Sequence, residues 1–203
     1  IMHDLKNLIA QQALVVENAA KHKENPAFVE DAIRTIDNSV TRMSTLLQKL
    51  QHNEPPEIRS LVLNKVLIEV SKKCRDLKPI PTLRLESSDI IINADPDRLS
   101  MSFVNIIKNA QEATSSDGFV DITLRREGNN AIITVEDNGE GMDEEFIQNR
   151  LFKPFITTKS DKGMGIGVYL ATEFITSLGG KLLAESSLGV GSTFTIVIPA
   201  TKG

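Results

Sequence analysis

The chain has 203 residues, enough for one large or two small domains, and its 40% apolar and 25% charged residues are typical of a soluble globular protein. The net charge is -4 with both signs scattered along the chain, which argues against binding to nucleic acid or to a membrane surface, because both need a basic patch. The one cysteine, Cys74, excludes an intrachain disulfide framework and a cysteine zinc cluster, and no apolar run approaches the roughly 20 residues that span a bilayer.

Residues 1–51 predict two helices joined by a turn, since they contain no glycine and only one proline, Pro26. Apolar residues before Pro26 recur at helical spacing, with Gln12 as a polar break. Those after it alternate three and four residues apart, which is typical of a coiled-coil seam: Phe28, Ala32, Ile36, Val40, Met43, Leu47 and Leu50. A lone helical hairpin buries too little apolar surface, so we expect a homodimeric four-helix bundle formed through residues 1–52.

A polar, proline-rich segment at residues 52–57 predicts a domain boundary. Beyond it the pattern changes to short strand-like runs separated by helical stretches. We expect strands at 60–63, 82–86, 90–93, 120–125, 131–136, 181–186 and 192–198, and helices at 64–75, 97–113 and 165–178. Antiparallel-looking strands with helices to one side predict an α+β fold, a two-layer α/β sandwich over residues 57–203.

Three short motifs in this second domain carry candidate ligand chemistry. Asn105 and Asn109 share one face of a predicted helix, and their amide oxygens suit Mg²⁺. Asp-Asn-Gly-Glu-Gly at 137–141 follows a predicted strand, where a carboxylate can accept a hydrogen bond from an amino group such as that of adenine. Gly-Met-Gly-Ile-Gly at 163–167 opens onto a helix and offers backbone N–H groups to phosphate.

Each motif alone also has a simpler interpretation. The two asparagines fit a solvated helix face, the acidic motif fits a hairpin turn, and one glycine-rich loop is a weak signal. The long stretch between the last two motifs holds Phe152-Lys153-Pro154-Phe155, and long loops in compact domains are usually functional lids or disordered segments. The phenylalanines could equally pack this loop onto the core.

The order of the motifs, followed by Gly-Ser-Thr-Phe at 191–194, resembles the ATP-binding domain shared by histidine kinases, Hsp90, MutL and gyrase B, the Bergerat or GHKL fold. The resemblance covers roughly residues 61–199 and implies ATP and Mg²⁺ as ligands. The nucleotide site that it implies consists of Asn105, Lys108, Asn109, Asp137, Gly139, Gly141, Lys159, Gly163, Gly165, Gly167 and Thr193.

The same resemblance implies a role for each group of residues. Asp137 would hold the adenine amino group with Gly141 beside it, and Thr193 would support that site. Asn109 would ligate Mg²⁺, and Asn105 would lie near the phosphates. The glycines at 163, 165 and 167 would line the triphosphate, and residues 142–162 would form a mobile lid. Many members carry a lysine where Glu112 stands here, so Lys108 or a lid lysine such as Lys159 would supply the cation.

ATPases of this superfamily carry a glutamate general base at the position of Asn105, and an asparagine cannot take up a proton at neutral pH. The resemblance therefore implies that ATP is held without efficient hydrolysis and that the phosphoryl group goes to another acceptor. His3-Asp4-Leu5-Lys6-Asn7 resembles the H-box of sensor histidine kinases. A lone surface histidine is usually only solvated, but here His3 would accept the phosphoryl group, Asp4 would orient the imidazole and take its proton, and Asn7 would position water for the reverse reaction.

We therefore expect a histidine autokinase of two-component systems that passes the phosphoryl group from His3 to an aspartate in the receiver domain of a response regulator. A GHKL-type serine kinase and a non-catalytic ATP-binding scaffold remain as alternatives. We expect no nucleic-acid partner, no membrane contact by this fragment and a cytoplasmic location. Because the chain opens in mid-pattern at Ile1, we expect a fragment of a longer, membrane-attached sensor.

Overall fold

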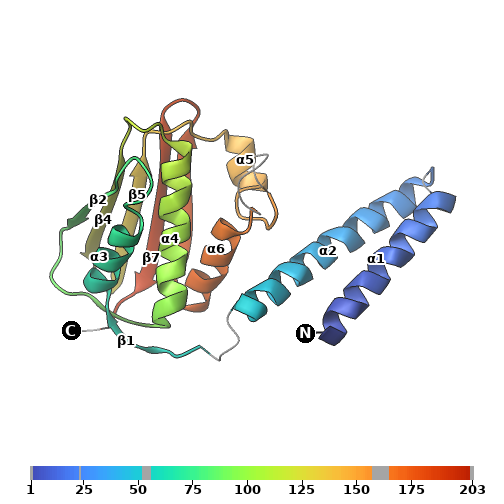
Figure 1. Ribbon diagram of the computed structural model, residues 1–203, viewed down its shortest axis with the longest axis horizontal. Helices are drawn as coiled ribbons and strands as arrows, with labels where there is room; N and C mark the ends of the chain where they lie inside the picture. The colour runs from blue at the N-terminus through green and yellow to red at the C-terminus, as the bar shows by residue number, and fades with distance from the viewer. Residues whose placement is uncertain (1, 23, 52–55, 157–164, 202–203) are drawn as a thin grey trace. The chain divides into compact units, whose positions relative to one another are not determined.

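The computed structural model describes residues 2–22, 24–51, 56–156 and 165–201 (Figure 1). The chain divides into two compact units, Ile1–Pro55 and Pro56–Gly203. The division falls inside the segment 52–57, whose residues are polar or proline, as is typical of a domain boundary.

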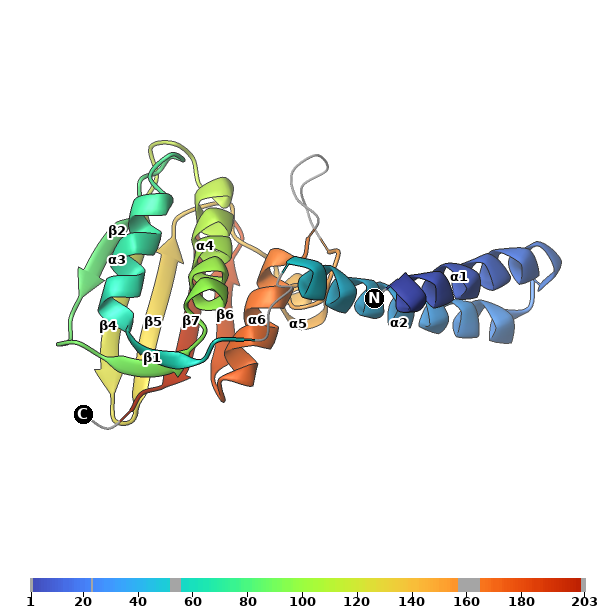
Figure 2. The same ribbon diagram turned by 60° about the horizontal axis from the view of Figure 1, so that its bottom comes forward.

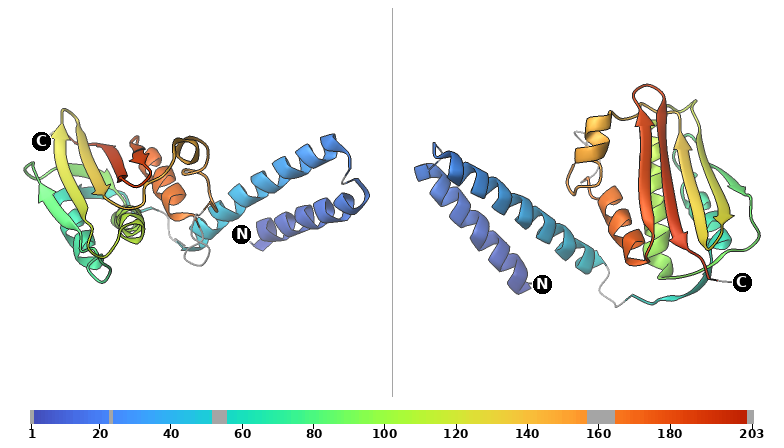
Figure 3. Two further views of the ribbon diagram at one scale, coloured as in Figure 1. Left: turned by 90° about the horizontal axis from the view of Figure 1, so that it is seen from above. Right: turned by 180° about the vertical axis from the view of Figure 1, so that it is seen from behind.

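The first unit is a pair of helices, α1 (Met2–His22) and α2 (Pro26–Gln51), which pack against each other (Figure 3). Asn25 begins α2: its side-chain Oδ1 accepts a hydrogen bond from the Ala27 backbone N–H at 3.1 Å, and proline follows at the first helical position. Gln12, the polar break in the apolar pattern of α1, donates to the buried Ser39 hydroxyl of α2 at 2.6 Å. The polar side chain of Gln12 therefore has a hydrogen-bond partner within the hairpin.

Most of the apolar side chains that the structure describes in this hairpin are exposed. Leu8 is the only buried one among them, whereas Leu14 is 59% exposed and Ile33 is 63% exposed. Ile36, which we expected in the helical seam, is also exposed. In a hairpin of two helices, each helix can bury only the side that faces the other, so apolar residues on the remaining sides stay exposed.

The second unit contains a five-stranded sheet in the order β2-β4-β5-β7-β6, and a separate antiparallel pair, β1 with β3. The strands are β1 (Arg59–Val62), β2 (Thr82–Leu85), β3 (Ile91–Ala94), β4 (Val120–Glu127), β5 (Asn130–Asp137), β6 (Lys181–Ser187) and β7 (Gly191–Pro199). The strands look antiparallel in sequence, and the sheet departs from that pattern at one edge, where β2 runs parallel to β4. Strand direction depends on the path of the intervening chain, which includes α4, and strand periodicity does not encode it.

Helices α3 (Leu63–Lys73), α4 (Pro96–Ala113) and α6 (Gly167–Ser177) cover one face of the sheet (Figure 2). The core lies between the two layers and contains Phe103 and Ile107 of α4, Ile175 of α6 and alternate residues of the central strands. The predicted two-layer sandwich is confirmed. A short helix, α5 (Glu144–Asn149), was not predicted and lies inside the segment that we expected to be a lid.

Asp95 holds the start of α4, the helix that carries Asn105 and Asn109. Its carboxylate accepts hydrogen bonds from the backbone N–H groups of Asp97 and Arg98, and from that of Glu57 at 2.9 Å. Burial opposes ionisation of this carboxyl, but the backbone hydrogen bonds and the Arg98 charge outweigh it and lower the pKa of Asp95. One side chain thus ties the beginning of the second unit to the N-terminus of α4.

Replacing Asp95 with alanine should lower the free energy of unfolding by about 1 to 2 kcal/mol, because the helix loses its N-cap and the Glu57 amide loses its acceptor. Asp95 has a lowered folded-state pKa, so its contribution is complete above the unfolded pKa of about 4 and is lost as the pH falls through the folded value. Urea unfolding of both chains at neutral and acidic pH measures this. The control Asp117→Ala, in an exposed loop, should change stability by less than about 0.5 kcal/mol.

Candidate functional site

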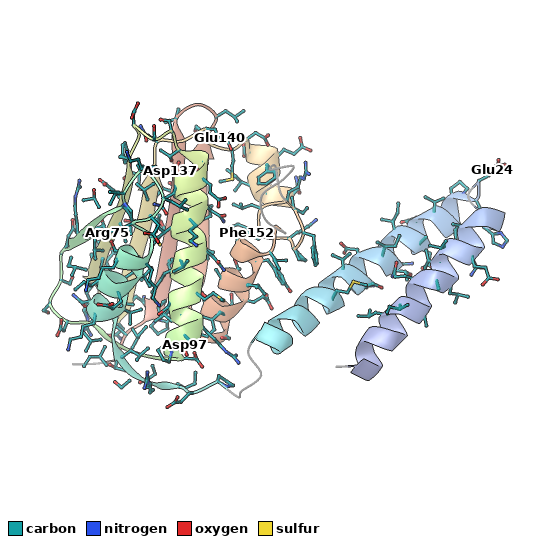
Figure 4. The ribbon with its side chains drawn as sticks, viewed as in Figure 1. Glu24, Arg75, Asp97, Asp137, Glu140 and Phe152 are labelled. Atoms are coloured by element: carbon teal, nitrogen blue, oxygen red, sulfur yellow. The ribbon has the colours of Figure 1, made fainter. Side chains whose placement is uncertain are left out.

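Three backbone segments meet at the C-terminal end of α4: the last residues of that helix, the turn 137–142 after β5, and the β6–β7 turn. The Glu140 backbone N–H donates to the Ala113 carbonyl at 2.9 Å, and the Gly189 N–H donates to the Glu140 carbonyl at 2.8 Å. Figure 4 shows Asp137 and Glu140 at the end of α4 opposite Asp97. The turn is therefore held on both sides by hydrogen bonds between backbone groups.

Glycine is required where these segments touch. A Cβ at Gly139 would overlap the carbonyl of Ala113, and one at Gly141, whose φ is 68°, would overlap the carbonyl of Ser187. Gly191 has a φ of 129°, and a Cβ there would overlap the carbonyl of Asp137. The glycines of the sequence motif are thus explained by close packing between backbone segments.

Asp137 ends β5 with a buried carboxyl group, only 4% exposed. One of its oxygens accepts a hydrogen bond from the Gly139 N–H at 2.8 Å. Burial, together with the neighbouring charge of Glu136, raises the pKa of Asp137, while hydrogen bonds from Gly139, Ser192 and Thr114 oppose the rise. A buried carboxylate with a raised pKa gains from a further donor, which suits an amino group on an aromatic base.

The residue beside Asp137 on the neighbouring strand is Ser192, whereas we expected Thr193 to support the site. Ser192 is the register partner of Asp137 in the β5–β7 pair, and Thr193 is the partner of Glu136. Ser192 and Phe194 are buried toward the helices, so strand alternation places Thr193 on the opposite face of the sheet. The assignment of Thr193 is corrected to Ser192.

Asn105 and the end of the glycine-rich motif lie together, although 62 residues separate them along the chain. The Asn105 Nδ2 donates to the Gly167 carbonyl at 3.4 Å, and a Cβ at Gly167 would be 3.5 Å from Asn105. Gly165 has a φ of 64° and lies against the backbone of Ile156. Asn109 is half-buried one turn further along α4. The packing of α4 against α6 therefore brings two of the sequence motifs into one place.

Lys108 is exposed on α4. Burial raises the pKa of the Cys74 thiol, and the positive charge of Lys108 partly opposes that rise. Cys74 is buried, as expected for a free cysteine. Lys159 and Gly163 lie outside the described residues.

The segment that we expected to be a lid begins with ordered structure. The Asp143 side chain accepts a hydrogen bond from the Phe146 N–H at 2.7 Å and caps α5. Phe152 packs against the core, whereas Phe155 is 37% exposed and has a φ of 61°. A bulky residue in that region of φ is strained, and such strain often occurs at functional loops.

His3, Asp4 and Asn7 all lie on α1, near its start. Their side chains lie outside the described part of the chain. The helical spacing predicted for them is confirmed, and their chemical roles stay predictions.

The chain is similar to several known proteins. Residues 94–202 match the family described as histidine kinase-, DNA gyrase B-, and HSP90-like ATPase. Sporulation kinase C of Bacillus subtilis (strain 168) is 38% identical over 114 residues, which make up 56% of this chain and 26% of that protein. Alginate biosynthesis sensor protein KinB of Pseudomonas aeruginosa is 28% identical over 216 residues, covering 97% of this chain and 35% of that protein.

Among solved structures, a nucleotide-free form of the catalytic domain of histidine kinase ThkA has a TM-score of 0.61 at 28% identity, covering 70% of this chain and 95% of that one. The chain spans only about a quarter to a third of the length of the two relatives above, 26% and 35%. In the part of the chain that the structure describes, no helix is both long enough and apolar enough to cross a membrane.

Replacing Gly141 with alanine tests whether the close contact with Ser187 costs stability beyond the cost of a positive φ. Gly128→Ala is the matched control, because Gly128 also has a positive φ of 59° but a Cβ there would meet no described atom within 4 Å. The control should cost about 1 to 2 kcal/mol of stability, the penalty for a left-handed alanine. Gly141→Ala should cost about 1 to 3 kcal/mol more, because the Ser187 carbonyl must move. Equal losses in urea unfolding would refute the close contact.

The buried Asp137 should make the stability of the ligand-free chain depend on pH. Its folded-state pKa is raised, so its stability relative to Asp137→Asn should be greatest below about pH 4 and should fall as the pH rises through the raised value. Urea unfolding of both chains between about pH 4 and about pH 7 measures this difference. A difference that grows in favour of the wild type as the pH rises would show that the carboxylate is not penalised by burial.

Proposed function

This chain belongs to the family of histidine kinase-, DNA gyrase B- and HSP90-like ATPases, and on that premise we propose that it is a sensor histidine kinase that uses ATP to phosphorylate His3. The observation that carries the proposal is the combination of a buried Asp137 with Asn105 in place of a general base. The first binds the nucleotide base, and the second leaves the site without a carboxylate to activate water. The relatives reported above are named as a sporulation kinase and a sensor protein, which favours the histidine kinase over the alternatives.

The residues present fit a nucleotide. Asp137 accepts the adenine amino group, and Gly139 and Gly141 hold the turn that follows it against the end of α4 and the end of β6. Ser192 supports the carboxylate from the next strand. Gly165 and Gly167 offer backbone groups to the phosphates near Asn105, and Lys159 and Gly163 belong to the same segment of sequence.

A divalent cation is part of the proposal, because amide oxygens and phosphates together suit Mg²⁺. The ion would neutralise phosphate charge during transfer. Asn109 is the residue assigned to hold it, since it is half-buried on α4 one turn from Asn105. Asn105 is kept in place by its hydrogen bond to the Gly167 carbonyl and has no proton-accepting group.

The phosphoryl acceptor is His3. A neutral imidazole nitrogen attacks the γ-phosphorus, the bond from phosphorus to the bridging oxygen breaks, and ADP leaves with that oxygen. Asp4 orients the imidazole and accepts its proton. Asn7 positions water for the reverse, dephosphorylating reaction. The phosphoryl group then passes from His3 to an aspartate in the receiver domain of a response regulator.

The hairpin is proposed to form a homodimer through residues 1–52. Exposed apolar residues on both helices support this proposal, because a second hairpin would remove them from water: Ile9, Leu14, Val16, Val29, Ile33 and Ile36. The use of ATP and the free thiol of Cys74 support a cytoplasmic location.

Autophosphorylation with γ-labelled ATP tests the proposal. Replacing His3 with glutamine should abolish labelling, because the acceptor nitrogen is lost. His22→Gln is the matched control, since His22 is an exposed histidine on the same helix, and it should label as the wild type does. The label should be lost in acid, as expected for phosphohistidine.

Three other outcomes would point elsewhere. Undiminished labelling of the His3→Gln chain would exclude His3 as the acceptor. Acid-stable label would indicate a serine kinase of the same superfamily. Nucleotide binding without any label would favour a scaffold that binds ATP without catalysis.

A further inference from the structure

Thr114 lies where the end of α4 meets Asp137, and its side chain is buried, with only 8% of the residue exposed. It directly follows α4, and its backbone N–H donates to the Gln111 carbonyl at 3.3 Å. The Ala110 carbonyl, in the last turn of the helix, therefore lacks the usual backbone donor four residues further on. The Thr114 hydroxyl takes that place and donates to the Ala110 carbonyl at 2.7 Å.

The same hydroxyl is also a hydrogen-bonding partner of the Asp137 carboxyl group. A threonine hydroxyl has one hydrogen, whereas the Ala110 carbonyl and an ionised carboxylate are both acceptors, so the two groups compete for it. Hydrogen bonds to charged groups are the stronger ones, so an ionised Asp137 draws the hydroxyl hydrogen toward itself. A protonated Asp137 can instead donate to the hydroxyl oxygen, which leaves the hydrogen to Ala110.

The two other donors to Asp137 differ from Thr114 in kind. Gly139 and Ser192 both offer backbone N–H groups, whose directions are set by the turn after β5 and by the pairing of β5 with β7. The Thr114 hydroxyl can rotate between two acceptors. It is therefore the donor that can adjust to the charge of Asp137.

The neighbours of Asp137 include one further ionisable side chain, that of Glu136 on the same strand. Its negative charge favours the protonated form of Asp137. The register partners of Asp137 are Val120 on β4 and Ser192 on β7, and neither side chain titrates near neutral pH. At the end of α4 the neighbour is Thr114, so the hydroxyl acts against the effects of burial and of Glu136.

Ala110 directly follows Asn109, the residue proposed to hold the metal ion. The Thr114 hydroxyl thus joins the carboxyl group that is proposed to bind the base to the last turn of the helix that carries Asn109. Both contacts depend on one hydrogen. Binding of a donor to Asp137 therefore changes what the hydroxyl offers to the end of α4.

We propose that Thr114 is a positioning residue whose single hydroxyl hydrogen is divided between Ala110 and Asp137, and that it thereby sets how strongly the Asp137 carboxylate accepts a ligand's amino group. This inference rests on the nucleotide binding proposed above. Without the hydroxyl, Asp137 should be harder to ionise. Once ionised, the carboxylate has one donor fewer and gains more from the donor of a ligand.

The first test measures the titration of the Asp137 carboxyl carbon by NMR in the ligand-free chain. Thr114→Val removes the hydroxyl and keeps a β-branched side chain, so the midpoint of the Asp137 titration should move to higher pH. Thr114→Ser keeps the hydroxyl and should restore the wild-type midpoint. Thr172→Val is the matched control, because the Thr172 hydroxyl makes the same kind of bond on α6, to the Val168 carbonyl at 2.8 Å, and it should leave the midpoint unchanged.

The second test measures the affinity for adenosine by calorimetry across the same pH range. A hydrogen bond to a carboxylate changes its protonation equilibrium about tenfold, so at the wild-type midpoint Thr114→Val should bind adenosine about fivefold more weakly. Well above both midpoints the variant should bind at least as tightly as the wild type, because the ionised carboxylate lacks a competing donor. A merely structural defect would weaken binding at every pH, so the crossing of the two profiles identifies the positioning role.

Several results would overturn the proposal. They are an Asp137 midpoint that does not rise in Thr114→Val, an affinity lowered by the same factor at every pH, and a serine variant that behaves like valine. If the valine variant does not fold, Thr114→Ala gives the same comparison, and unfolding of both would show that the hydroxyl serves the fold alone. Failure of the proposed function appears separately, as a wild-type chain that binds no adenosine while the Asp137 midpoint still moves in Thr114→Val.

Discussion

Direct contact between backbone segments at three glycines is the constraint on which the candidate nucleotide site depends. Gly139 lies against Ala113 at the end of α4, Gly141 against Ser187, and Gly191 against Asp137. No residue with a Cβ fits there, so the turn after β5, the β6–β7 turn and the end of α4 can only meet as they do if all three glycines are present. The carboxyl group of Asp137 is buried at the centre of this contact.

Burial of the Asp137 carboxyl group lowers the stability of the ionised, ligand-free chain, but it leaves an acceptor that a ligand donor can use. An ionised carboxyl group in a largely closed site is costly, which is why its pKa is raised, and three nearby donors reduce that cost only in part. A ligand that supplies another donor completes the set of hydrogen bonds. Ser192 and Ser186 extend this set outward to Met142, so the polar network that supports the acid also reaches the residue before α5 and its cap.

In the proposed function, Asn105 leaves the site without a proton acceptor for water, so the phosphoryl group needs an acceptor elsewhere in the protein. An ATPase of this superfamily uses a glutamate here, whereas the Asn105 amide donates to the Gly167 carbonyl and cannot take a proton. In the proposed reaction the acceptor lies in the helical unit. Within the second unit, the Asp95 carboxylate binds both Glu57, near the start of the unit, and the first turn of the helix that carries Asn105.

The amino-acid sequence by itself determined the helical hairpin, nearly every element of the second unit and the positions of Asn105, Asp137 and the glycine motifs, because local periodicity and turn chemistry are written into neighbouring residues. Only the tertiary structure decided the parallel pairing of β2 with β4, since strand direction follows the route of the chain between them. It also decided that Ser192 and not Thr193 faces Asp137, because strand register selects the face. The contact between Ser186 and Met142 could not be seen in sequence, since 44 residues separate them and only folding brings the Met142 N–H to that hydroxyl.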